Sequence, residues 1–374
     1  MAPTPRALPV PLPPADPAAL REFASRLVAW QRREGRHDLP WQNTRDPYRI
    51  WLSEIMLQQT QVSTVIPYYA RFLEAFPTLA DLAAAPLERV LELWSGLGYY
   101  ARARHLHACA VAVCAQYGGH FPPSPELIAQ LPGIGRSTAA AIGAFAFDCR
   151  AAILDGNVKR VLTRCFGIAG FPGSPRVEKG LWALAEALLP EAPDMVAYTQ
   201  GIMDLGAGLC ARSKPACVLC PLQEHCVARR EGRQEELPEG KPGKAVPERQ
   251  VSACIFHDGE RILLERRPPS GIWGGLLTLP EAGTEESAPA QAQRLGLDLL
   301  AAAPLPPLRH TFTHFRLILS PWLCRVGPER MLREGSWEWL PWSRVGEAAL
   351  PAPIKKLLLG LEGAQAAPSA SSGN

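Results

Sequence analysis

The sequence predicts two domains of different fold class: an all-α domain over residues 18–228 and an α+β domain over residues 248–362. A chain of 374 residues is long enough to bury two separate cores. Alanine and leucine at helical spacing dominate the first part, whereas the second part contains short apolar runs typical of strands. Between them, residues 229–247 are charged and rich in proline and glycine, which is typical of a linker.

The composition and the chain ends limit the class of protein. Hydrophobic residues make up 47% of the chain and charged residues 20%, as in globular proteins. No run approaches the roughly 20 apolar residues of a membrane span, and proline interrupts the N-terminal segment too often for a signal peptide. We expect residues 1–17 to be a disordered arm and residues 363–374 a disordered tail. We expect a cytoplasmic monomer with no membrane partner, associated with the nucleoid if the source is bacterial.

The first domain is expected to consist of short helices. Asp46 followed by Pro47 indicates a helix start. In the helix that follows, Glu54 shares one face with Gln58 and Gln61. The apolar face of this helix comprises Leu52, Ile55, Met56, Val62 and Ile66. Prolines and glycines at positions 67, 77, 86, 96, 98, 118 and 122 are expected to divide the rest.

Four cysteines lie within one short segment, residues 210–226, in the pattern Cys-x6-Cys-x2-Cys-x5-Cys. They are Cys210, Cys217, Cys220 and Cys226. Four thiolates wrapped around one centre suit an iron–sulfur cube, which takes one ligand per iron. A zinc knuckle ranks lower, because zinc sites tend to use two close couples set well apart. Disulfides are disfavoured because nothing marks the chain as secreted.

A glycine turn, Leu131-Pro-Gly-Ile-Gly135, lies between two predicted helices at 125–130 and 137–147. Gly133 and Gly135 allow a tight turn, and the free N–H groups after it can hold a phosphate. A bare Gly-x-Gly would be an ordinary helix–helix turn. The full segment, residues 125–147, resembles the helix-hairpin-helix of DNA repair proteins. Three acid-free stretches (99–125, 156–177 and 205–223) also favour a polyanionic partner.

Asp155 follows two apolar residues and precedes a helix that opens near Asn157. An aspartate beside a helix N-terminus is expected to be held as the anion, although a plain N-cap has the same pattern. The order of hairpin, aspartate and four cysteines resembles the endonuclease III superfamily of DNA glycosylases over about residues 20–228. The resemblance implies a 4Fe-4S cluster on the cysteines, a catalytic Asp155 at the sugar C1′, and DNA contacts from Gly133, Gly135, Ser137 and Asn157.

Ser137 stands where the lyase branch of this superfamily has its nucleophilic lysine, and no lysine lies nearby. A serine cannot form a Schiff base, so base release without efficient strand cleavage is expected. Three further segments resemble adenine DNA glycosylases of the MutY family: Leu39-Pro-Trp41-Gln, Trp51-Leu-Ser-Glu54-Ile-Met-Leu-Gln-Gln-Thr-Gln and Gly96-Leu-Gly-Tyr-Tyr-Ala-Arg102.

Glu54 is the residue that favours this branch. Its apolar neighbours and the absence of a cation in helical reach predict a raised pKa and a role as an acid, although a surface glutamate is the commoner case. The resemblance implies that Glu54 protonates adenine N7 and that the substrate is duplex DNA with adenine opposite 8-oxoguanine or guanine. It also implies that Trp41 lines the adenine pocket, Asp204 helps hold the base, Gln59 and Leu97 fill the vacated stack, and Tyr99 probes the opposite base. Core packing is the alternative for Trp41, Leu97 and Tyr99.

The second domain is expected to have strands at 251–256, 261–266, 312–324 and 336–342 and helices at 288–300 and 354–361. Arg266-Arg-Pro-Pro-Ser-Gly-Ile-Trp-Gly-Gly275 followed by Leu279-Pro-Glu281 resembles a Nudix fold. The metal-binding glutamates of a Nudix hydrolase are missing from 288–296, so hydrolysis is not expected. The resemblance instead implies recognition of 8-oxoguanine by the segment that contains Thr313 and His314.

Three other functions fit parts of the sequence less well. A bifunctional glycosylase/lyase for oxidised pyrimidines lacks its lysine at Ser137. A mismatch sensor that binds without cleaving would not need both Glu54 and Asp155. A nucleotide-pool pyrophosphatase would need the missing glutamates.

Overall fold

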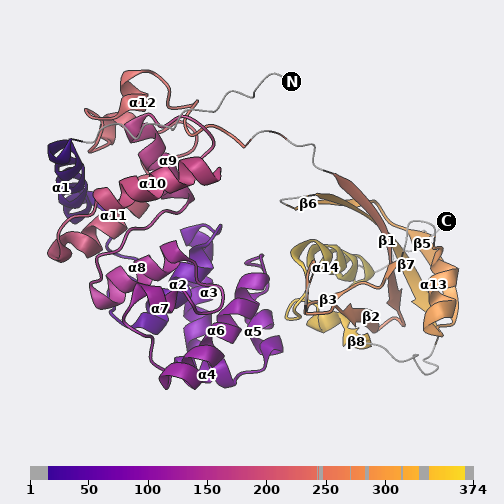
Figure 1. The fold of residues 1–374 in the computed structure, drawn as a ribbon. Helices are drawn as coiled ribbons and strands as arrows, with labels where there is room; N and C mark the ends of the chain where they lie inside the picture. The colour runs from indigo at the N-terminus through magenta and orange to yellow at the C-terminus, as the bar shows by residue number, and fades with distance from the viewer. Residues whose placement is uncertain are drawn as a thin grey trace, which may run out of the picture. The chain divides into compact units, whose positions relative to one another are not determined.

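The computed structural model describes residues 16–241, 243, 247–269, 271–282, 286–312, 315–327 and 337–366. The chain divides into two compact units, both drawn in Figure 1. Unit 1 comprises residues 1–69, 76–83 and 108–243, and unit 2 comprises residues 70–75, 84–107 and 244–374. Unit 2 therefore combines the α+β part of the chain with helical residues from much earlier in the sequence, at 70–75 and 84–107. Within the described ranges, no helix has the length and apolarity that a membrane span requires.

Unit 1 is all-α, as the sequence predicts. Its helices, some of which continue into unit 2, are α1 (Pro17–Glu34), α2 (Pro47–Leu57), α3 (Val62–Ala75), α4 (Leu79–Ala84), α6 (Ala101–Tyr117), α7 (Pro125–Ile128), α8 (Arg136–Phe147), α9 (Gly156–Phe166), α10 (Pro175–Ala187), α11 (Met195–Ala207) and α12 (Val227–Arg230). Two short 3-10 turns, η1 (Ala192–Asp194) and η2 (Cys217–Leu219), lie before α11 and within the cysteine segment.

The predicted start of α2 is confirmed, but its predicted length and one predicted helix break are wrong. Helix α2 ends at Leu57, so that Gln61 lies outside it and Val62 and Ile66 belong to α3. Asp46 caps α2 by accepting a hydrogen bond from the Tyr48 backbone N–H at 2.9 Å. Helix α3, in contrast, continues through Pro67. Proline there removes one backbone hydrogen bond, but burial of the Val65 and Tyr69 side chains stabilises the helix on either side.

The core of unit 1 fixes the position of the cysteine segment. Buried side chains of α1, α9, α10 and α11 meet in one cluster that includes Leu27, Leu162, Leu181 and Leu205. Cys210, Cys220 and Cys226 pack against the edge of this cluster. The segment is therefore attached to the same core that positions the start of α9.

Unit 2 contains one mixed sheet, two helices that flank it, and α5 (Leu87–Trp94). The strands are β1 (Glu248–His257), β2 (Arg261–Arg266), β3 (Leu277–Thr278), β4 (Glu281–Ala282), β5 (Leu299–Pro304), β6 (Leu308–Thr311), β7 (Arg316–Val326) and β8 (Trp337–Pro341). The main strand order is β3-β2-β1-β7-β5, with β4 on β1, β6 on β7 and β8 on β2. Strands β1 and β7 are parallel, and the other pairs are antiparallel.

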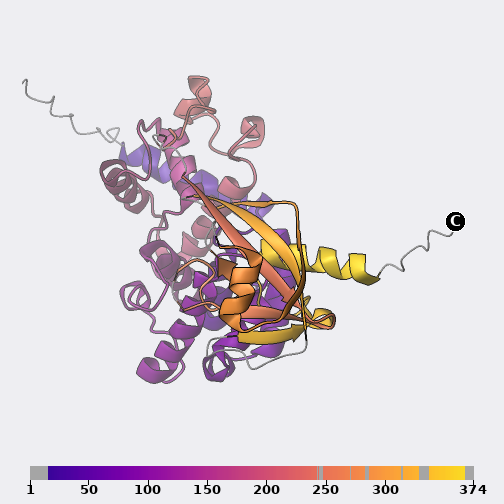
Figure 2. The same cartoon turned by 90° about the vertical axis from the view of Figure 1, so that its right-hand side faces the viewer.

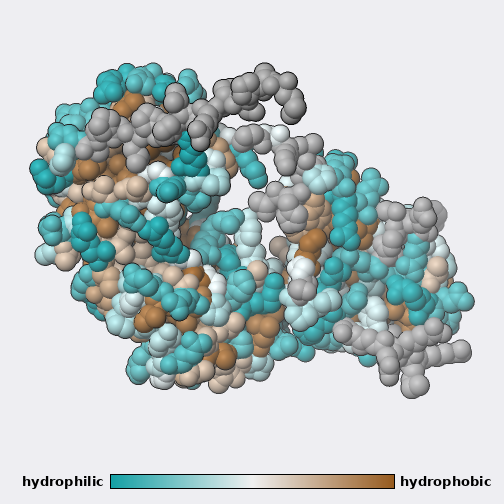
Figure 3. Space-filling view, viewed as in Figure 1, coloured by the Kyte–Doolittle hydropathy of each residue, from teal (hydrophilic) through white to brown (hydrophobic). Residues whose placement is uncertain are grey.

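Alternation along β1 sends side chains to the two faces of this sheet. Val251 and Ile255 face one core with Leu358 of α14 (Ala352–Ala366). Phe256 faces the other core with Leu295 of α13 (Ala288–Leu295). Figures 1 and 2 show the two helices on opposite faces of the sheet. Apolar residues form separate small patches among hydrophilic ones on the face shown in Figure 3.

The predicted fold class is confirmed, with three corrections in unit 2. The predicted helix 288–300 ends at Leu295, where Gly296 takes a φ of +76°, and residues 299–304 form strand β5 instead. The predicted strand 312–324 begins later, at Arg316, as β7, and residues 308–311 before it form an additional strand, β6, that pairs with β7. Helix α14 runs on to Ala366, past the predicted start of the disordered tail. The β1–β2 pair around residues 257–259 is as predicted.

Candidate active site and cysteine segment

A cavity of about 370 Å³ opens within unit 1 beside α2. Glu54 lies in its wall, together with the ring of Trp41 and the apolar side chains of Phe145 and Met203. The volume is in the range of small-molecule sites. Polar side chains complete the lining, and they include Arg36, His37, Gln42, Asn43 and Gln200. A flat apolar ring with hydrogen-bonding edges would match such a lining.

Glu54 is the carboxyl group in this wall. Burial raises its pKa to about 8, and the neighbouring charge of Asp155 adds to the effect. Protein atoms surround the carboxyl closely, although the residue keeps some exposure toward the cavity. At neutral pH the protonated form therefore predominates, and Glu54 can donate a proton into the cavity. The raised pKa that the sequence predicts is present in the structure.

Asp155 caps the N-terminus of α9. Its Oδ1 accepts a hydrogen bond from the Val158 backbone N–H at 2.7 Å. The sequence predicted that these donors would hold Asp155 as the anion. In the structure burial has the larger effect and raises the pKa of Asp155 above its ordinary value, while the Val158 and Asn157 N–H groups only offset part of that rise. Asp155 therefore caps α9, and the same buried carboxylate interacts electrostatically with Glu54.

The glycine turn is joined to the Asp155 segment through Ser137. The Ser137 hydroxyl accepts a hydrogen bond from the Leu154 backbone N–H at 2.9 Å. Gly133 takes a φ of +75°, a region that favours glycine, and Gly135 precedes the first residue of α8 with open space around its Cα. The first N–H groups of a helix have no partner within the helix, so the start of α8 can donate to a ligand, while Ser137 holds the residue before Asp155.

Asp204 is buried, and its two oxygens already accept several hydrogen bonds. Oδ1 accepts from Arg36 Nε at 2.7 Å and from Gln200 Nε2 at 2.7 Å, and Oδ2 accepts from the Arg36 backbone N–H at 2.9 Å. Arg36 and Gln200 line the cavity, whereas Asp204 lies behind them. Asp204 can therefore orient two residues that line the cavity. The sequence alone did not distinguish this supporting role from direct contact with a base.

The other predicted DNA-contacting residues lie in two places. Gln59, in unit 1, is exposed with a φ of +58° directly after α2. Leu97 and Tyr99, in unit 2, lie in the turn between α5 and α6. Leu97 is buried, but Tyr99 is 51% exposed with a φ of +48°. An exposed aromatic ring in a strained backbone conformation does not fit the core-packing alternative for Tyr99.

The four cysteines line one small cavity together with Arg164 and Cys165. Arg164 is almost fully buried, and its guanidinium donates to the Ala211 carbonyl at 2.7 Å and lies 3.4 Å from Cys210 Sγ. A buried cation beside thiolates suits a cluster with net negative charge. Across the described parts of the chain, no group of three or more His, Cys, Asp or Glu side chains is placed to hold a single metal ion.

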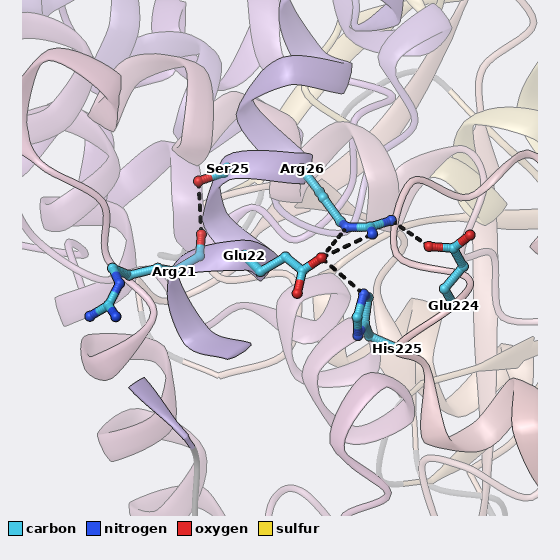
Figure 4. A network of polar contacts seen from close by, with 6 residues as sticks. All are labelled: Arg21, Glu22, Ser25, Arg26, Glu224 and His225. Carbon is cyan, nitrogen blue, oxygen red and sulfur yellow. Dashed lines mark hydrogen bonds and ion pairs between the residues drawn. The ribbon is translucent and has the colours of Figure 1, made fainter. Parts of the chain in front are cut away.

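Helix α1 anchors the end of the cysteine segment through a polar network, drawn in Figure 4. Arg26 donates to Glu22 at 3.0 Å on its own helix and to Glu224 at 2.8 Å across the loop. His225 Nε2 lies 3.3 Å from Glu22 Oε1. These contacts tie the residues immediately before Cys226 to helix α1.

In the acid-free stretch 156–177, Arg176 is exposed, but the other three cations are held by groups of the protein itself. Arg160 donates to the carbonyls of Cys210 and Gly206, and Lys159 is paired with Glu178 at 2.6 Å. Arg160 and Arg164 thus position the cysteine segment on α9, whereas Lys159 joins α9 to α10. In the stretch 205–223, by contrast, Arg212 and Lys214 are exposed. Stretches without acidic residues therefore have two different roles in this protein. One holds the cysteine segment on α9, and the other forms a basic surface.

In unit 2, four aromatic side chains near the predicted lesion-reading segment in sequence or in space contact one another. This aromatic group consists of Trp273, His310, Phe312 and Phe315. The rings of Phe312 and Phe315 are stacked 4.5 Å apart, on either side in sequence of Thr313 and His314, which lie outside the described residues. Helix α13 carries no acidic residue, and Glu281 is paired with Arg267 at 3.0 Å.

Comparison with known proteins identifies both parts of the chain. Residues 52–187 match the model of the HhH-GPD superfamily base excision DNA repair proteins, and residues 251–360 match a NUDIX domain model. The adenine DNA glycosylase of Buchnera aphidicola (subsp. Acyrthosiphon pisum) is 36% identical over 338 residues, which covers 90% of this chain and 96% of that protein. The chain belongs to the adenine DNA glycosylase family.

Other relatives agree with this assignment. The human adenine DNA glycosylase is 35% identical and covers 94% of this chain and 76% of its own length. The solved structure of a thermostable thymine-DNA glycosylase superposes with a TM-score of 0.51 at 31% identity, and covers 58% of this chain and all of that one. As a member of this family, the glycosylase hydrolyses N-glycosidic bonds in base excision repair, and DNA is its partner.

Proposed function

We propose that this glycosylase removes adenine from duplex DNA in which adenine is paired with 8-oxoguanine or guanine, with Glu54 as the general acid. The observation that supports this most directly is the position of Glu54 in the cavity wall with a pKa raised to about 8. A carboxyl group that is protonated at neutral pH can transfer its proton to adenine N7. The C1′–N9 bonding electrons then leave with a neutral base.

Asp155 would stabilise the positive charge that develops at C1′. Because Asp155 interacts electrostatically with Glu54, loss of the Glu54 proton places two negative charges close together. Transfer of that proton to the base therefore coincides with development of the oxocarbenium ion, whose charge offsets both carboxylates. Water then adds to C1′, and the product is an abasic site with an intact strand.

The absence of lyase activity is part of the proposal. Ser137 occupies the position beside Asp155 and is already engaged with the Leu154 N–H. The sequence of α8, RSTAAAIGAFAF, contains no lysine. No amine on this helix is therefore available to attack C1′ after the base has left.

We propose further that Cys210, Cys217, Cys220 and Cys226 hold a 4Fe-4S cluster. Their shared cavity and the buried Arg164 guanidinium beside Cys210 support this ligand set. When bound, the cluster supplies a rigid link between four points of the segment, and Arg160 and Arg164 fix that segment to α9. The cluster has no part in breaking the glycosidic bond in this scheme.

The α+β part of unit 2 is proposed to recognise the opposite base. Helix α13 lacks the carboxylates with which a Nudix hydrolase holds its metal, which disfavours hydrolysis of a diphosphate. Thr313 and His314 lie in sequence between two stacked phenylalanines, and aromatic side chains beside polar ones suit contact with an exposed base. We keep both residues as the proposed contacts to 8-oxoguanine.

The deciding experiment measures adenine release from duplexes with adenine opposite 8-oxoguanine, guanine or thymine. Base release should precede any strand break, and breaks should appear only after alkali. The duplex with 8-oxoguanine should react fastest. Equal rates on all three duplexes would refute the proposed specificity, and alkali-independent breaks would refute the monofunctional assignment.

A further inference from the structure

The turn that carries Leu97 and Tyr99 is held in shape by two side chains of unit 2. We define residues 95–102 as the corner. Arg102 Nη2 donates to the carbonyls of Leu97 and Gly98, both at 3.2 Å, and Trp94 Nε1 donates to Gly98 at 3.1 Å. The Arg102 guanidinium also lies 5.6 Å from the centre of the Tyr99 ring. The corner backbone is thus constrained while the Tyr99 ring remains half-exposed.

Two residues beyond the corner, Arg104 contacts the β2–β3 loop of the same unit. Its Nη1 donates to the Gly274 carbonyl at 2.7 Å. Gly274 is buried, and a Cβ at this position would lie 2.5 Å from the Pro269 carbonyl oxygen, so the loop backbone has little room to shift. A guanidinium that is partly shielded from water makes a strong hydrogen bond to such a fixed carbonyl.

The residue before Gly274 leads directly to the aromatic group. Trp273 takes a φ of +56°, a strained conformation for a bulky residue. Its ring centre lies 5.5 Å from that of Phe312 and 6.3 Å from that of His310. Phe312 in turn makes an edge contact with His310 at 4.6 Å. A shift of the loop backbone at Gly274 would therefore move the ring on which Phe312 packs.

A second set of contacts joins the corner to the start of α14. The Tyr100 hydroxyl donates to the Leu350 carbonyl at 3.0 Å, and Lys355 Nζ donates to Ser95 Oγ at 3.1 Å. Leu350 is fully buried in the core that also contains Val251, Ile255 and Leu358. These contacts fix the base of the corner, and Arg104 adds a hydrogen bond from α6 to the loop that carries Trp273.

We propose that Arg104 is a positioning residue that couples the corner to the aromatic group through Gly274 and Trp273. The inference rests on the proposed function, together with the role of Tyr99 at the base opposite adenine that the family resemblance implies; Phe312 and Phe315 flank the proposed contacts to that base in sequence. In this arrangement a base that displaces Phe312 also biases the corner, and the two elements respond to the same lesion together. Arg104 itself touches neither the adenine cavity nor Glu54, which lie in unit 1.

Arg104→Met tests the coupling because methionine keeps much of the aliphatic stem but has no donor. Single-turnover adenine release is measured on duplexes with adenine opposite 8-oxoguanine and opposite guanine. Coupling energies of this kind correspond to about two- to thirty-fold, so the 8-oxoguanine preference should fall by that factor while the rate on the guanine duplex stays unchanged. Arg89→Met is the matched control, since Arg89 lies on α5 and its side chain is paired with Glu92 on the surface at 3.1 Å.

A double-mutant cycle with Trp273→Ala separates coupling from general damage. The two substitutions should be non-additive, with the double variant no worse than the poorer single variant, and Trp273→Phe should restore most of the preference. Hydrogen exchange at Gly274 and Gly275 should quicken in Arg104→Met while the melting temperature changes little. Arg104→Gln, whose shorter side chain cannot reach Gly274, replaces Arg104→Met if that variant does not fold, with the same expected loss.

An unchanged preference in a folded Arg104 variant, or multiplicative effects in the cycle, would overturn the coupling and leave the proposed function intact. Equal loss of rate on both duplexes would show a structural role only, and would also overturn it. If the wild-type protein itself shows no preference for 8-oxoguanine, the proposed specificity fails, and the inference about Arg104 fails with it.

Discussion

The raised pKa of Glu54 predicts opposite effects of Glu54→Gln on activity and on stability. The substitution keeps the shape of the side chain but removes its acid, and general acid catalysis contributes about 10²–10⁴-fold. Adenine release should fall by that factor, while binding to the mismatched duplex should remain. In the wild type the rate should be highest near neutral pH and should fall to about half at pH 8, with about a tenth of Glu54 still protonated at pH 9 if its pKa is about 8.

The stability effect follows from the same pKa. The folded protein holds the Glu54 proton up to about pH 8, whereas the unfolded chain releases it near the ordinary value of 4.5. Stability from this group is therefore complete below pH 4.5 and declines as the pH rises to about 8, by at most about 1.4 kcal/mol per pH unit. Glutamine has no proton to lose. The melting temperature of Glu54→Gln should consequently exceed that of the wild type by a margin that grows between pH 5 and pH 8.

The assay combines single-turnover base release and thermal unfolding over pH 5–9, at one fixed salt concentration because contacts to phosphate depend on salt. Glu74→Gln is the matched control, since Glu74 is exposed on α3. It should change neither profile. Near-normal adenine release by Glu54→Gln, or a wild-type rate that does not decline above pH 8, would refute the assignment of Glu54 as the acid.

Three further predictions concern the other parts of the protein. Purified protein should be brown and contain about four irons per chain, because four thiols share one cavity; stoichiometric zinc without iron after anaerobic preparation would contradict the cluster. Ser137→Lys should make some of the enzyme trappable by borohydride, because an amine beside Asp155 can form a Schiff base with the opened sugar; wild-type enzyme that traps equally well would show that Ser137 does not prevent lyase chemistry. His314→Ala should reduce the preference for 8-oxoguanine over guanine without slowing release from the guanine duplex, since one good base contact contributes about 1–3 kcal/mol of discrimination; an unchanged ratio would mean that other residues recognise the lesion.

Local patterns predicted much of the site. Asp46-Pro47 fixes the start of α2, and the glycines at 133 and 135 fix the turn before α8, since both depend on backbone rules that act over a few residues. The raised pKa of Glu54 was also predictable, because its own helix surrounds it with apolar neighbours. Strand β5 was not, because Leu-Leu-Ala-Ala-Ala-Pro has no alternation and forms a strand only by pairing with β7.

The sequence by itself determined the fold classes, the two carboxylates and the four-cysteine pattern, since each is written in residue types at short spacing. Only the tertiary structure decided what the charges do. Arg160 and Arg164 looked like a basic surface but are held by carbonyls of the cysteine segment. Burial likewise reversed the expected direction of the Asp155 pKa, because desolvation depends on residues distant in sequence that close over the carboxylate.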